Sequence, residues 1–544
     1  MCADAQQLEL KDWTIPAMLR RRTEENPHGQ FLQFEDTTLS FADVAYSVDR
    51  LATGFATLGV SKGDRVLIMM DNSLDLVVTW FAINRLGAIE VPVNTANRGR
   101  FLEHIINNSA GRWIVADECY VDVIEEVAGP LPSLDYLVVR RPHGNADLPA
   151  RWRVEDFARL SKHEGILPDL TVTYRDIGAI LYTSGTTGPA KGVLMPHAHM
   201  AMIAYQAVDM LRIKSTDVNM VCLPLFHAHA QFVQIQAALY AGCKAVIYPR
   251  FSATQWLNQI RHSGATVSSL LGVMAQFLWA QPSSPHDSHH NCRRLIAQPL
   301  PSAIAQVFER RFKVRCLEIY GMTEIAMPVS SSIDEDVRPG AAGKVRQDSY
   351  DVNIVHPETD EELPSGQEGE IVVRPKVPWT LMQGYSGMPE ETVRAWRNLW
   401  FHTGDSGRFD DDGYLYFVDR IKDRIRRRGE NISSYEVESV VNDFPDVTEC
   451  AVVAVPAEEG DDDIKACVVT EPGVAFNPVT LLDHCREKMP YFAIPRYVQV
   501  MDELPKTPTG KIVKHELRRG GTAGAWDRES VGYVVKTNAG TVQQ

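Results

Sequence analysis

Residues 177–192 read IGAILYTSGTTGPAKG, and this stretch decides the fold class of the 544-residue chain. Its first part, 177–182, is an apolar run of the kind that forms a buried strand. Its second part is a glycine- and hydroxyl-rich loop that ends at Lys191. Similar apolar runs alternate with helical patterns through the first 400 residues, so the sequence predicts an α/β fold with largely buried strands.

The loop after this strand has the composition of an anion site. Gly185 and Gly188 allow backbone amides to turn inward, Lys191 adds a positive charge, and the hydroxyl donors are Thr183, Ser184, Thr186 and Thr187. The loop therefore suits a polyphosphate. It is not a Walker A loop, because Ala190 and Gly192 flank the lysine and leave no hydroxyl beside it for magnesium. Composition alone also allows a flexible surface loop.

The composition is that of a globular protein, with 44% hydrophobic and 23% charged residues, which excludes disordered and fibrous classes. The formal net charge of −15 excludes nucleic acid as a partner attracted by overall charge, and it likewise excludes an anionic membrane surface. An anionic ligand must therefore be drawn in by a local basic site.

The nine cysteines are scattered and form no C-x-x-C pair, which indicates reduced thiols, a cytoplasmic location and no zinc ribbon. The longest apolar window, 74–93, is interrupted by charged residues and proline, so no membrane span is predicted. The sequence leaves the oligomeric state open, with a homodimer as one option.

The order of predicted elements divides the chain. A helix over 40–59 begins with a capping box of Ser40 and Asp43, and further elements are a strand at 65–70, a helix at 76–86 and strands at 218–223, 245–248 and 267–270. Strands at 368–374 and 414–418 follow. After a boundary near Arg420 come strands at 449–455 and 465–470 and a helix capped by Asn477 with Pro478 at its first position.

These elements predict three parts: a large domain over 1–420, a small α+β domain over 421–519 and a flexible tail over 520–544. The tail is rich in glycine and polar residues and has no clear core.

Two further segments carry chemistry within the large part. Residues 318–324, EIYGMTE, combine an aromatic face, a glycine, a hydroxyl and a carboxylate, which can hold adenine, phosphate oxygen and Mg²⁺. Asp405 ends the run 402–405, HTGD, and can accept from both ribose hydroxyls, with the guanidinium of Arg420 beside it. The alternatives are a turn aspartate at Asp405 and a weak surface ion pair at Arg420.

Two more sites stand on single residues. The run 505–512, PKTPTGKI, is a rigid turn that projects Lys511. The alternative for Lys511 is an isolated, solvated lysine without a function. His227 and His229 lie at alternate positions, but no third ligand with supporting spacing occurs nearby in sequence, which argues against a metal. A satisfied buried histidine is the alternative for His227.

Taken in this order and at these separations, the four segments closely resemble the adenylate-forming superfamily of acyl- and aryl-CoA synthetases, non-ribosomal peptide adenylation domains and beetle luciferases. The resemblance covers the chain to about Arg519. The run 419–433, DRIKDRIRRRGENIS, looks most like the crotonobetaine/carnitine-CoA ligase and fatty-acyl-CoA synthetase branch. The implied fold is a large body of layered α/β subdomains with a β-barrel-like part, and a small mobile α+β C-terminal domain.

The resemblance implies roles for the residues of the large part. The loop from Thr183 to Lys191 wraps the β- and γ-phosphates, and Thr183 and Glu324 lie near Mg²⁺. Asp405 and Arg420 bind ribose. Tyr320 stacks on adenine, and Thr323 lies by the α-phosphate. The adenine side also includes the neighbours of Tyr320 and a loop that here lacks the family's frequent glycines: Glu318, Ile319, Gly321, Met322, Ala297, Gln298 and Pro299.

It also implies roles in the acid site and the small domain. Lys511 lies between the carboxylate and the α-phosphate, and His227 lines the acyl channel. Lys422 is the hinge about which the small domain turns. CoA is approached at the basic run, through Arg426, Arg428 and Gly429.

The implied activity is an ATP- and Mg²⁺-dependent acyl-CoA synthetase. It activates a small-molecule carboxylic acid as acyl-AMP with release of pyrophosphate, and then transfers the acyl group to CoA. Three alternatives stay open: a ligase that loads a carrier-protein thiol, a light-emitting or other oxygenase, and a non-catalytic nucleotide-binding protein. The acid also stays open among aryl, medium-chain, carnitine-like and larger terpenoid or polyketide acids.

Overall fold

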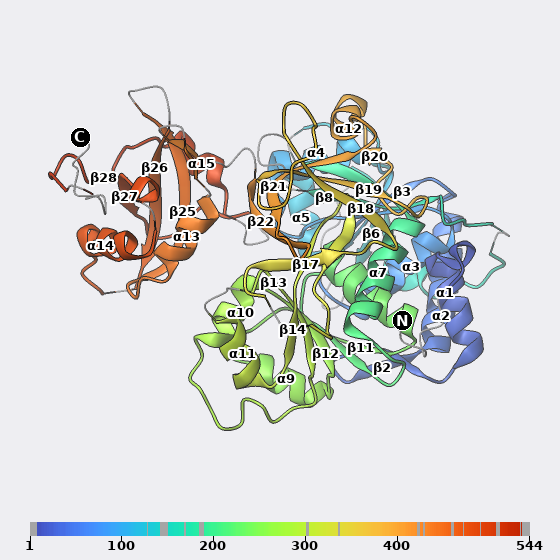
Figure 1. Cartoon of the computed structure of the whole chain (residues 1–544). Helices are drawn as coiled ribbons and strands as arrows, with labels where there is room; N and C mark the ends of the chain where they lie inside the picture. Colours follow the sequence, from blue (N-terminus) through green and yellow to red (C-terminus); the bar gives the residue numbers. More distant parts are fainter. Residues whose placement is uncertain are drawn as a thin grey trace.

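The computed structural model describes residues 8–127, 129–141, 151–167, 170–183, 190–300, 304–335, 338–420, 425–427, 430–432, 434–457, 462–471, 473–489, 491–507, 512–533 and 535. In this part of the chain, three large sheets form one body, and a smaller sheet forms a second body that stands beside it (Figure 1).

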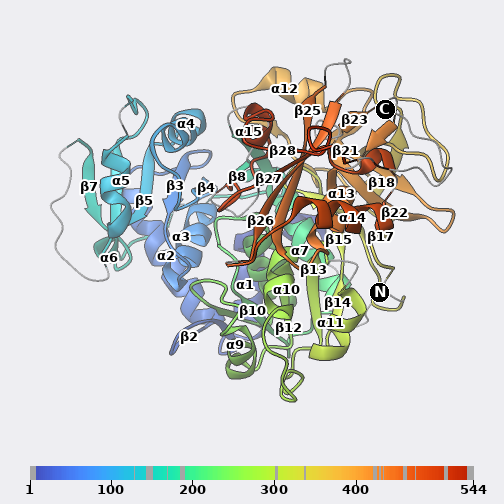
Figure 2. The same ribbon diagram turned by 90° about the vertical axis from the view of Figure 1, so that its left-hand side faces the viewer.

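An eight-stranded sheet contains the strand that precedes the glycine-rich loop. Its order is β20-β9-β8-β4-β3-β5-β6-β7. Five pairs from β8 to β7 are parallel, whereas β9 and β20 add antiparallel strands at one edge. Helices surround the β3–β7 part (Figure 2). The strands are β3 (Arg65–Met69), β4 (Ile89–Pro92), β5 (Trp113–Asp117), β6 (Tyr136–Arg140), β7 (Arg153–Asp156), β8 (Ile177–Thr183), β9 (Lys191–Pro196) and β20 (Gly384–Tyr385).

A seven-stranded sheet has the order β14-β13-β12-β10-β11-β1-β2 and is parallel except at the β1–β2 hairpin. It confirms the strands predicted at 218–223, 245–248 and 267–270. The strands are β1 (Gln30–Phe34), β2 (Thr37–Ser40), β10 (Val218–Val221), β11 (Lys244–Ile247), β12 (Val267–Leu271), β13 (Arg294–Gln298) and β14 (Arg315–Leu317).

Helices cover and join these two sheets. Ser40 and Asp43 form the predicted capping box at the start of α2. Helix α3 begins at Leu74 rather than at residue 76, because the Ser73 side chain accepts from the Leu76 N–H as N-cap. The helices are α1 (Ile15–Glu25), α2 (Phe41–Thr57), α3 (Leu74–Arg85), α4 (Gly99–Ser109), α5 (Val121–Glu125), α6 (Phe157–Leu160), α7 (His197–Leu211), the π-helix η3 (His229–Gln236), α8 (Ala237–Ala241), α9 (Trp256–Ser263), α10 (Gly272–Trp279) and α11 (Ala305–Phe312).

Helix α7 joins the layers of the large body. It is buried along almost its whole length and packs against β8 and β9 of one sheet, β13 of the second and β16 of the third. One continuous apolar core therefore includes residues of all three sheets, such as Val66, Val267 and Leu415.

The third sheet is antiparallel, with the order β15-β16-β17-β22-β21-β19-β18. It confirms the strands predicted at 368–374 and 414–418. The elements are β15 (Ile319–Met322), β16 (Ala326–Ser330), β17 (Ala341–Val345), β18 (Tyr350–Val355), β19 (Gly369–Pro375), α12 (Pro389–Ala395), β21 (Phe401–Phe409) and β22 (Tyr414–Arg420).

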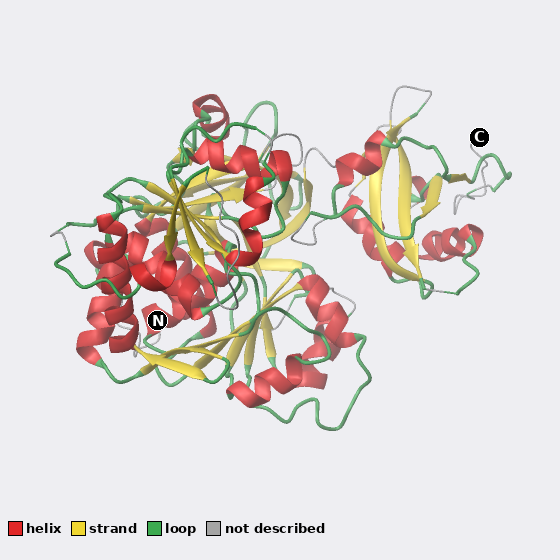
Figure 3. Cartoon of the chain, turned by 180° about the vertical axis from the view of Figure 1, so that it is seen from behind, coloured by secondary structure: helices red, strands yellow, loops and turns green. Residues whose placement is uncertain are grey.

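The smaller body has helices on both sides of its sheet (Figure 3). The Asn477 side chain caps α14 as predicted, by accepting from the Val479 N–H. The elements are β23 (Ile425–Arg427), β24 (Glu430–Ile432), α13 (Ser434–Asn442), β25 (Val447–Pro456), β26 (Asp462–Thr470), α14 (Pro478–Lys488), β27 (Tyr497–Val500), α15 (Lys514–Arg519) and β28 (Trp526–Asp527).

The segment after Arg519 differs from the flexible tail that its composition predicts. Trp526 pairs with Val498, and the Tyr533 hydroxyl donates to Asp483 Oδ1 over 2.7 Å. Residues 520–533 therefore pack against the small sheet, because their aromatic side chains find apolar and polar partners there. Residues 536–544 lie outside the described residues.

The domain boundary at residues 420 and 421 stays a prediction, since residues 421–424 lie outside the described residues. No helix within the described ranges has the length and apolar character needed to cross a membrane.

Candidate active site

Tyr320, Asp405 and Arg420 meet in the antiparallel sheet. The Tyr320 hydroxyl donates to Asp405 Oδ2 over 3.0 Å, and Arg420 Nε lies 3.4 Å from Asp405 Oδ1. Strands β21 and β22 place Asp405 opposite Arg420. Burial, and then the charge of Asp405, raise the pKa of Tyr320, so its phenol stays protonated and donates. The structure thus joins three residues that the sequence assigned to one nucleoside site.

The turn that carries Asp405 is supported by a residue that sequence reasoning missed. Glu370 of β19 accepts from the Gly404 N–H over 3.0 Å, and its other oxygen lies 2.9 Å from His402 Nδ1. Gly404 has a φ of 70°, a conformation that favours glycine. The Thr403 hydroxyl accepts from the Asp405 N–H over 3.1 Å. These contacts hold the carboxylate of Asp405 toward Tyr320.

Glu324 lies in the turn between β15 and β16, and it is 5% exposed. Burial raises the pKa of its carboxyl. Its Oε1 accepts from the Tyr385 hydroxyl over 3.0 Å. The two strands approach closely, since a Cβ at Gly321 would lie 2.2 Å from the carbonyl oxygen of Ala326. Glycine at 321 is therefore required for this hairpin.

Lys191 lies at the start of β9, where the glycine-rich loop ends. Its Nζ is 2.6 Å from Oε2 of Glu391 on α12 and 4.8 Å from the centre of the Tyr385 ring. The predicted phosphate lysine and the predicted magnesium ligand Glu324 thus share one neighbour, Tyr385. Sequence reasoning missed Tyr385 and Glu391; the only local signal is a Gly-Tyr pair followed by a proline-started acidic helix.

Both ends of the loop lie side by side. Thr183 and Lys191 are paired residues of β8 and β9, and the Thr183 hydroxyl is 3.4 Å from the Lys191 carbonyl oxygen. The residues between them that were assigned to phosphate lie outside the described residues: Ser184, Gly185, Thr186, Thr187 and Gly188.

The predicted adenine-side loop lies at the end of β13. Ala297 and Gln298 pair with Leu270 and Leu271 of β12, and the peptide between Gln298 and Pro299 is cis. Ile296 of β13 pairs with Leu317 of β14, the residue before Glu318, and burial raises the pKa of Glu318 to about 8. The structure therefore brings this loop beside the segment that carries Tyr320. Ile319, Met322 and Thr323 are half-buried.

His227 and His229 lie where β10 leads into the π-helix η3. The His227 carbonyl accepts from the Gln231 N–H over 3.1 Å, and the His227 ring lies 4.6 Å from that of Phe226. Burial lowers the pKa of His229 to about 4, so this imidazole is neutral at physiological pH. His227 is half-buried, and its role in an acyl channel stays a prediction.

Most of the predicted small-domain site residues lie outside the described residues: Lys422, Arg428, Gly429 and Lys511. Of Arg426, the structure shows its backbone pairing with Asn431 between β23 and β24. A described contact joins the two bodies beside them. Asp419 Oδ2 accepts from the Ser434 N–H over 2.8 Å and from its hydroxyl over 2.6 Å.

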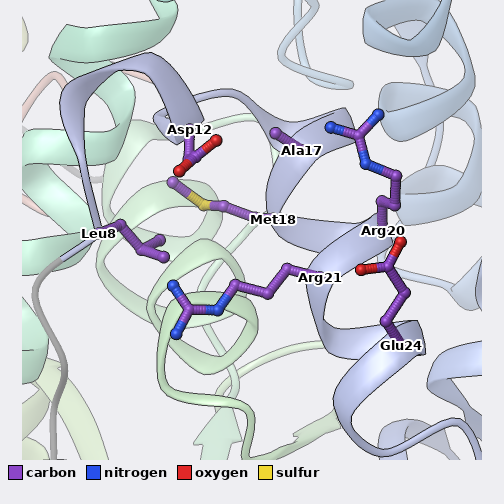
Figure 4. A pocket seen from close by; sticks show the side chains of 7 residues that line it. All are labelled: Leu8, Asp12, Ala17, Met18, Arg20, Arg21 and Glu24. Carbon is purple, nitrogen blue, oxygen red and sulfur yellow. The ribbon is translucent and has the colours of Figure 1, made fainter.

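A surface hollow of about 160 Å³ lies at the N-terminal helix, away from the motif segments in sequence (Figure 4). It is lined by Leu8, Asp12, Ala17, Met18, Arg20, Arg21 and Glu24. None of these residues belongs to a motif discussed above.

Known proteins share this architecture and these segments. The family model for AMP-binding enzymes matches residues 19–386, and that for the AMP-binding enzyme C-terminal domain matches residues 436–511. The chain belongs to the AMP-binding enzyme family. It is 31% identical over 485 residues to a crotonobetaine/carnitine–CoA ligase of Salmonella paratyphi A, covering 88% of this chain and 93% of that protein.

Solved structures of this family overlay on most of the chain. ATP-bound MatB from Rhodopseudomonas palustris has a TM-score of 0.83 at 28% identity, covering 92% of this chain and 98% of that one. The anthranilate CoA ligase AuaEII in complex with anthranoyl-AMP has a TM-score of 0.84 at 25% identity, covering 95% of this chain and 98% of that one.

Membership of this family identifies the reaction. The protein is an AMP-forming acid–thiol ligase that converts a carboxylic acid into acyl-AMP with ATP and then transfers the acyl group to CoA. Mg²⁺ is typical of the family. Carboxylate and hydroxyl oxygens, such as those of Glu324 and Thr183, are ligands of the kind that this ion prefers, and these two residues would be the ones to hold it.

Proposed function

We propose that the large body binds ATP with two groups of residues at once: Tyr320, Asp405 and Arg420 at the nucleoside, and Lys191 and Glu324 at the phosphates. One observation carries this assignment. Tyr320 and Glu324 are four residues apart on one hairpin, and each is hydrogen-bonded to a residue from a distant segment. A single short hairpin thus connects the nucleoside group with the phosphate group.

At the nucleoside, each residue offers the chemistry its role needs. Asp405 accepts from the ribose hydroxyls, with Arg420 beside it, and the face of Tyr320 stacks on adenine. Burial keeps the Glu318 carboxyl neutral below about pH 8, which makes it a hydrogen-bond donor on the adenine side. Ala297, Gln298 and Pro299 border that side, with Thr323 toward the α-phosphate.

At the phosphates, the reaction needs positioning and charge neutralisation rather than proton transfer. A carboxylate oxygen of the acid attacks the α-phosphorus and pyrophosphate leaves. Glu324 and Thr183 would hold Mg²⁺, which would neutralise phosphate charge there when bound. Lys191 and the loop from Thr183 hold the leaving phosphates, and Lys511 lies between the two reacting groups.

The second half-reaction uses the small domain, proposed as residues 421–519. A rotation about Lys422 withdraws Lys511 and brings forward the basic run with Arg426, Arg428 and Gly429, where CoA phosphates bind. The arginines support CoA over a carrier-protein thiol, because guanidinium groups pair with phosphates.

The acid is proposed to enter past His227, and the relatives named above set the first compounds to test. Carnitine-like and aryl acids come first, followed by medium-chain acids. A cytoplasmic location is supported by nine cysteines without a C-x-x-C pair, and the absence of a nucleic-acid partner by the net charge of −15. A homodimer is the assembly to test first by light scattering.

A screen of pyrophosphate release across these acids, with and without CoA, tests the proposal. One class of acid should release pyrophosphate and form acyl-AMP without CoA, and should give AMP and thioester only when CoA is added. Acid-independent pyrophosphate release, or thioester formation with a carrier protein but not with CoA, contradicts it.

A further inference from the structure

Tyr385 contacts both of the groups assigned to the phosphate end of the site. Its hydroxyl donates to Glu324 Oε1 over 3.0 Å, and its ring centre lies 4.8 Å from Lys191 Nζ. A lysine at this distance from an aromatic face is attracted by the ring quadrupole. The two groups are 133 residues apart in sequence, and Tyr385 comes from a third segment.

The segment that carries Tyr385 is fixed on both sides. Tyr385 pairs with Val193 of β9, two residues after Lys191, and the Met382 N–H donates to the Glu324 carbonyl over 2.9 Å. The Tyr385 N–H donates to the Thr392 hydroxyl over 2.9 Å. Tyr385 is 8% exposed. It therefore connects the edge of the parallel sheet with the turn of the antiparallel one.

The geometry of the pair suits a fixed donor. The Tyr385 hydroxyl donates to Glu324 Oε1, and both side chains are buried, so water does not compete for this hydrogen bond. A buried carboxylate without this donor loses a charge-assisted hydrogen bond that holds its orientation.

We propose that Tyr385 is a positioning residue that holds Glu324 in place as a Mg²⁺ ligand and aligns Lys191 with it for the phosphates of ATP. This inference rests on the proposed function and deepens it. The hydroxyl acts through Glu324 and the ring acts through Lys191, so the two halves of the side chain have separable effects.

The variant Tyr385→Phe tests the hydroxyl, since it keeps the ring under Lys191. The readout is the dissociation constant of ATP measured by titration calorimetry, with Mg²⁺ and separately with EDTA. We expect Tyr385→Phe to weaken Mg²⁺–ATP binding about tenfold and Mg²⁺-free ATP binding less than twofold. A purely structural defect changes both constants together, which overturns the inference.

Tyr414 offers a matched control in the same body. Its hydroxyl also donates to a carboxylate, that of Glu335, and Lys344 Nζ lies 4.5 Å from its ring centre. Tyr414→Phe therefore removes the same kind of hydrogen bond outside the candidate site. It should leave both ATP constants unchanged, and an equal Mg²⁺-specific loss in this control overturns the inference.

A double-mutant cycle tests the route through Glu324. In a Glu324→Ala background, adding Tyr385→Phe should change Mg²⁺–ATP binding by less than twofold, because the acceptor is already gone. An undiminished effect overturns the inference. If Tyr385→Phe does not fold, Thr392→Val replaces it, since it removes the acceptor of the Tyr385 N–H, and it should shift the Mg²⁺–ATP constant in the same direction by about threefold.

These measurements separate the inference from the proposed function. A wild-type protein that binds Mg²⁺–ATP but shows no acid-dependent pyrophosphate exchange refutes the proposed function. An active wild type whose Tyr385→Phe variant keeps the wild-type Mg²⁺ dependence refutes the role of Tyr385 alone.

Discussion

The large body and the small domain differ in how their parts are held together. One apolar core runs through all three sheets of the large body. Tyr320 and Tyr385 belong to this core, and they hydrogen-bond Asp405 of the nucleoside group and Glu324 of the phosphate group. The small domain has two cores of its own, one on each face of its sheet. Among the described residues, the junction includes the Asp419–Ser434 contact and an edge-to-face pair of Phe417 and Tyr435.

This difference suggests a division of labour, with ATP binding in the large body and the catalytic lysine in the small domain. The groups that we propose to bind ATP lie in a body with one continuous core, whereas the small domain, to which we assign Lys511, has cores of its own and can therefore be expected to move as a unit. Changes in the large body should therefore act on ATP binding, and changes in the small domain on later steps.

Lys511→Ala should have the largest effect. Loss of the positive charge between the reacting groups should lower acid-dependent pyrophosphate exchange at least ~100-fold. ATP binding and thioester formation from supplied acyl-AMP should change far less. The control is Lys506→Ala on the same turn, whose lysine pairs with Glu449 over 2.7 Å. Equal loss of both half-reactions contradicts the assignment.

Asp405→Asn should have the next largest effect, because it removes the charge that Tyr320 and Arg420 face. Two charge-assisted contacts are weakened, and the ATP dissociation constant should rise ~30- to 100-fold in calorimetry. Asp351→Asn, at a surface ion pair with Arg374, should leave it unchanged. If Asp405→Asn leaves the ATP dissociation constant unaltered, Asp405 does not bind ribose and is only a turn aspartate.

Glu318 should make stability depend on pH. Its pKa is raised from 4.5 to about 8 in the folded state, mainly by burial, so the stability that its neutral form provides is lost as pH rises from about 4.5 through about 8. Glu318→Gln cannot ionise, so its free energy of unfolding should exceed that of the wild type by ~4 kcal/mol near pH 8, with no difference near pH 4. Thermal melting across pH measures this. Glu125→Gln, at an exposed residue, should follow the wild-type profile.

Asp419→Ala should act mainly on the junction, although Asp419 Oδ1 also accepts from the Arg420 N–H over 2.7 Å within the large body. Its carboxylate accepts two hydrogen bonds at the first residue of α13, and a carboxylate at a helix N-terminus contributes ~1 kcal/mol. The melting transition of the small domain should fall by a few degrees, in keeping with a loss of that order. Calorimetric ATP binding should stay within twofold of the wild type, and a larger loss of binding shows that the two bodies are not energetically separate.

Glu391→Gln should have the smallest effect and the opposite sign. Glu391 forms an ion pair with Lys191 in this structure, and if Lys191 binds ATP phosphates as proposed, they displace Glu391. A half-exposed ion pair is worth up to ~1 kcal/mol, so removing the charge should tighten ATP binding about threefold. Glu390→Gln, one residue earlier and exposed, should not change binding. Weaker binding in Glu391→Gln shows that Glu391 supports Lys191 rather than competing with ATP.

Local signals predicted much of the fold. The capping box at Ser40 and the Asn477 cap each depend on residues within four positions, and both are confirmed. The strand at 177–182 is confirmed with one residue added, because its apolar run and loop are contiguous. The segment after Arg519 was misjudged, because the partners of Trp526 and Tyr533 lie 28 and 50 residues away in sequence.

The candidate site divides in the same way. The sequence by itself determined which residue types could bind phosphate, ribose and metal, because these depend on side-chain chemistry and short spacing. Only the tertiary structure decided that Lys191 pairs with Glu391, that Glu370 supports Asp405, and that Tyr385 reaches Glu324. Partners and pKa shifts depend on burial and on contacts between distant strands, and no local pattern encodes them.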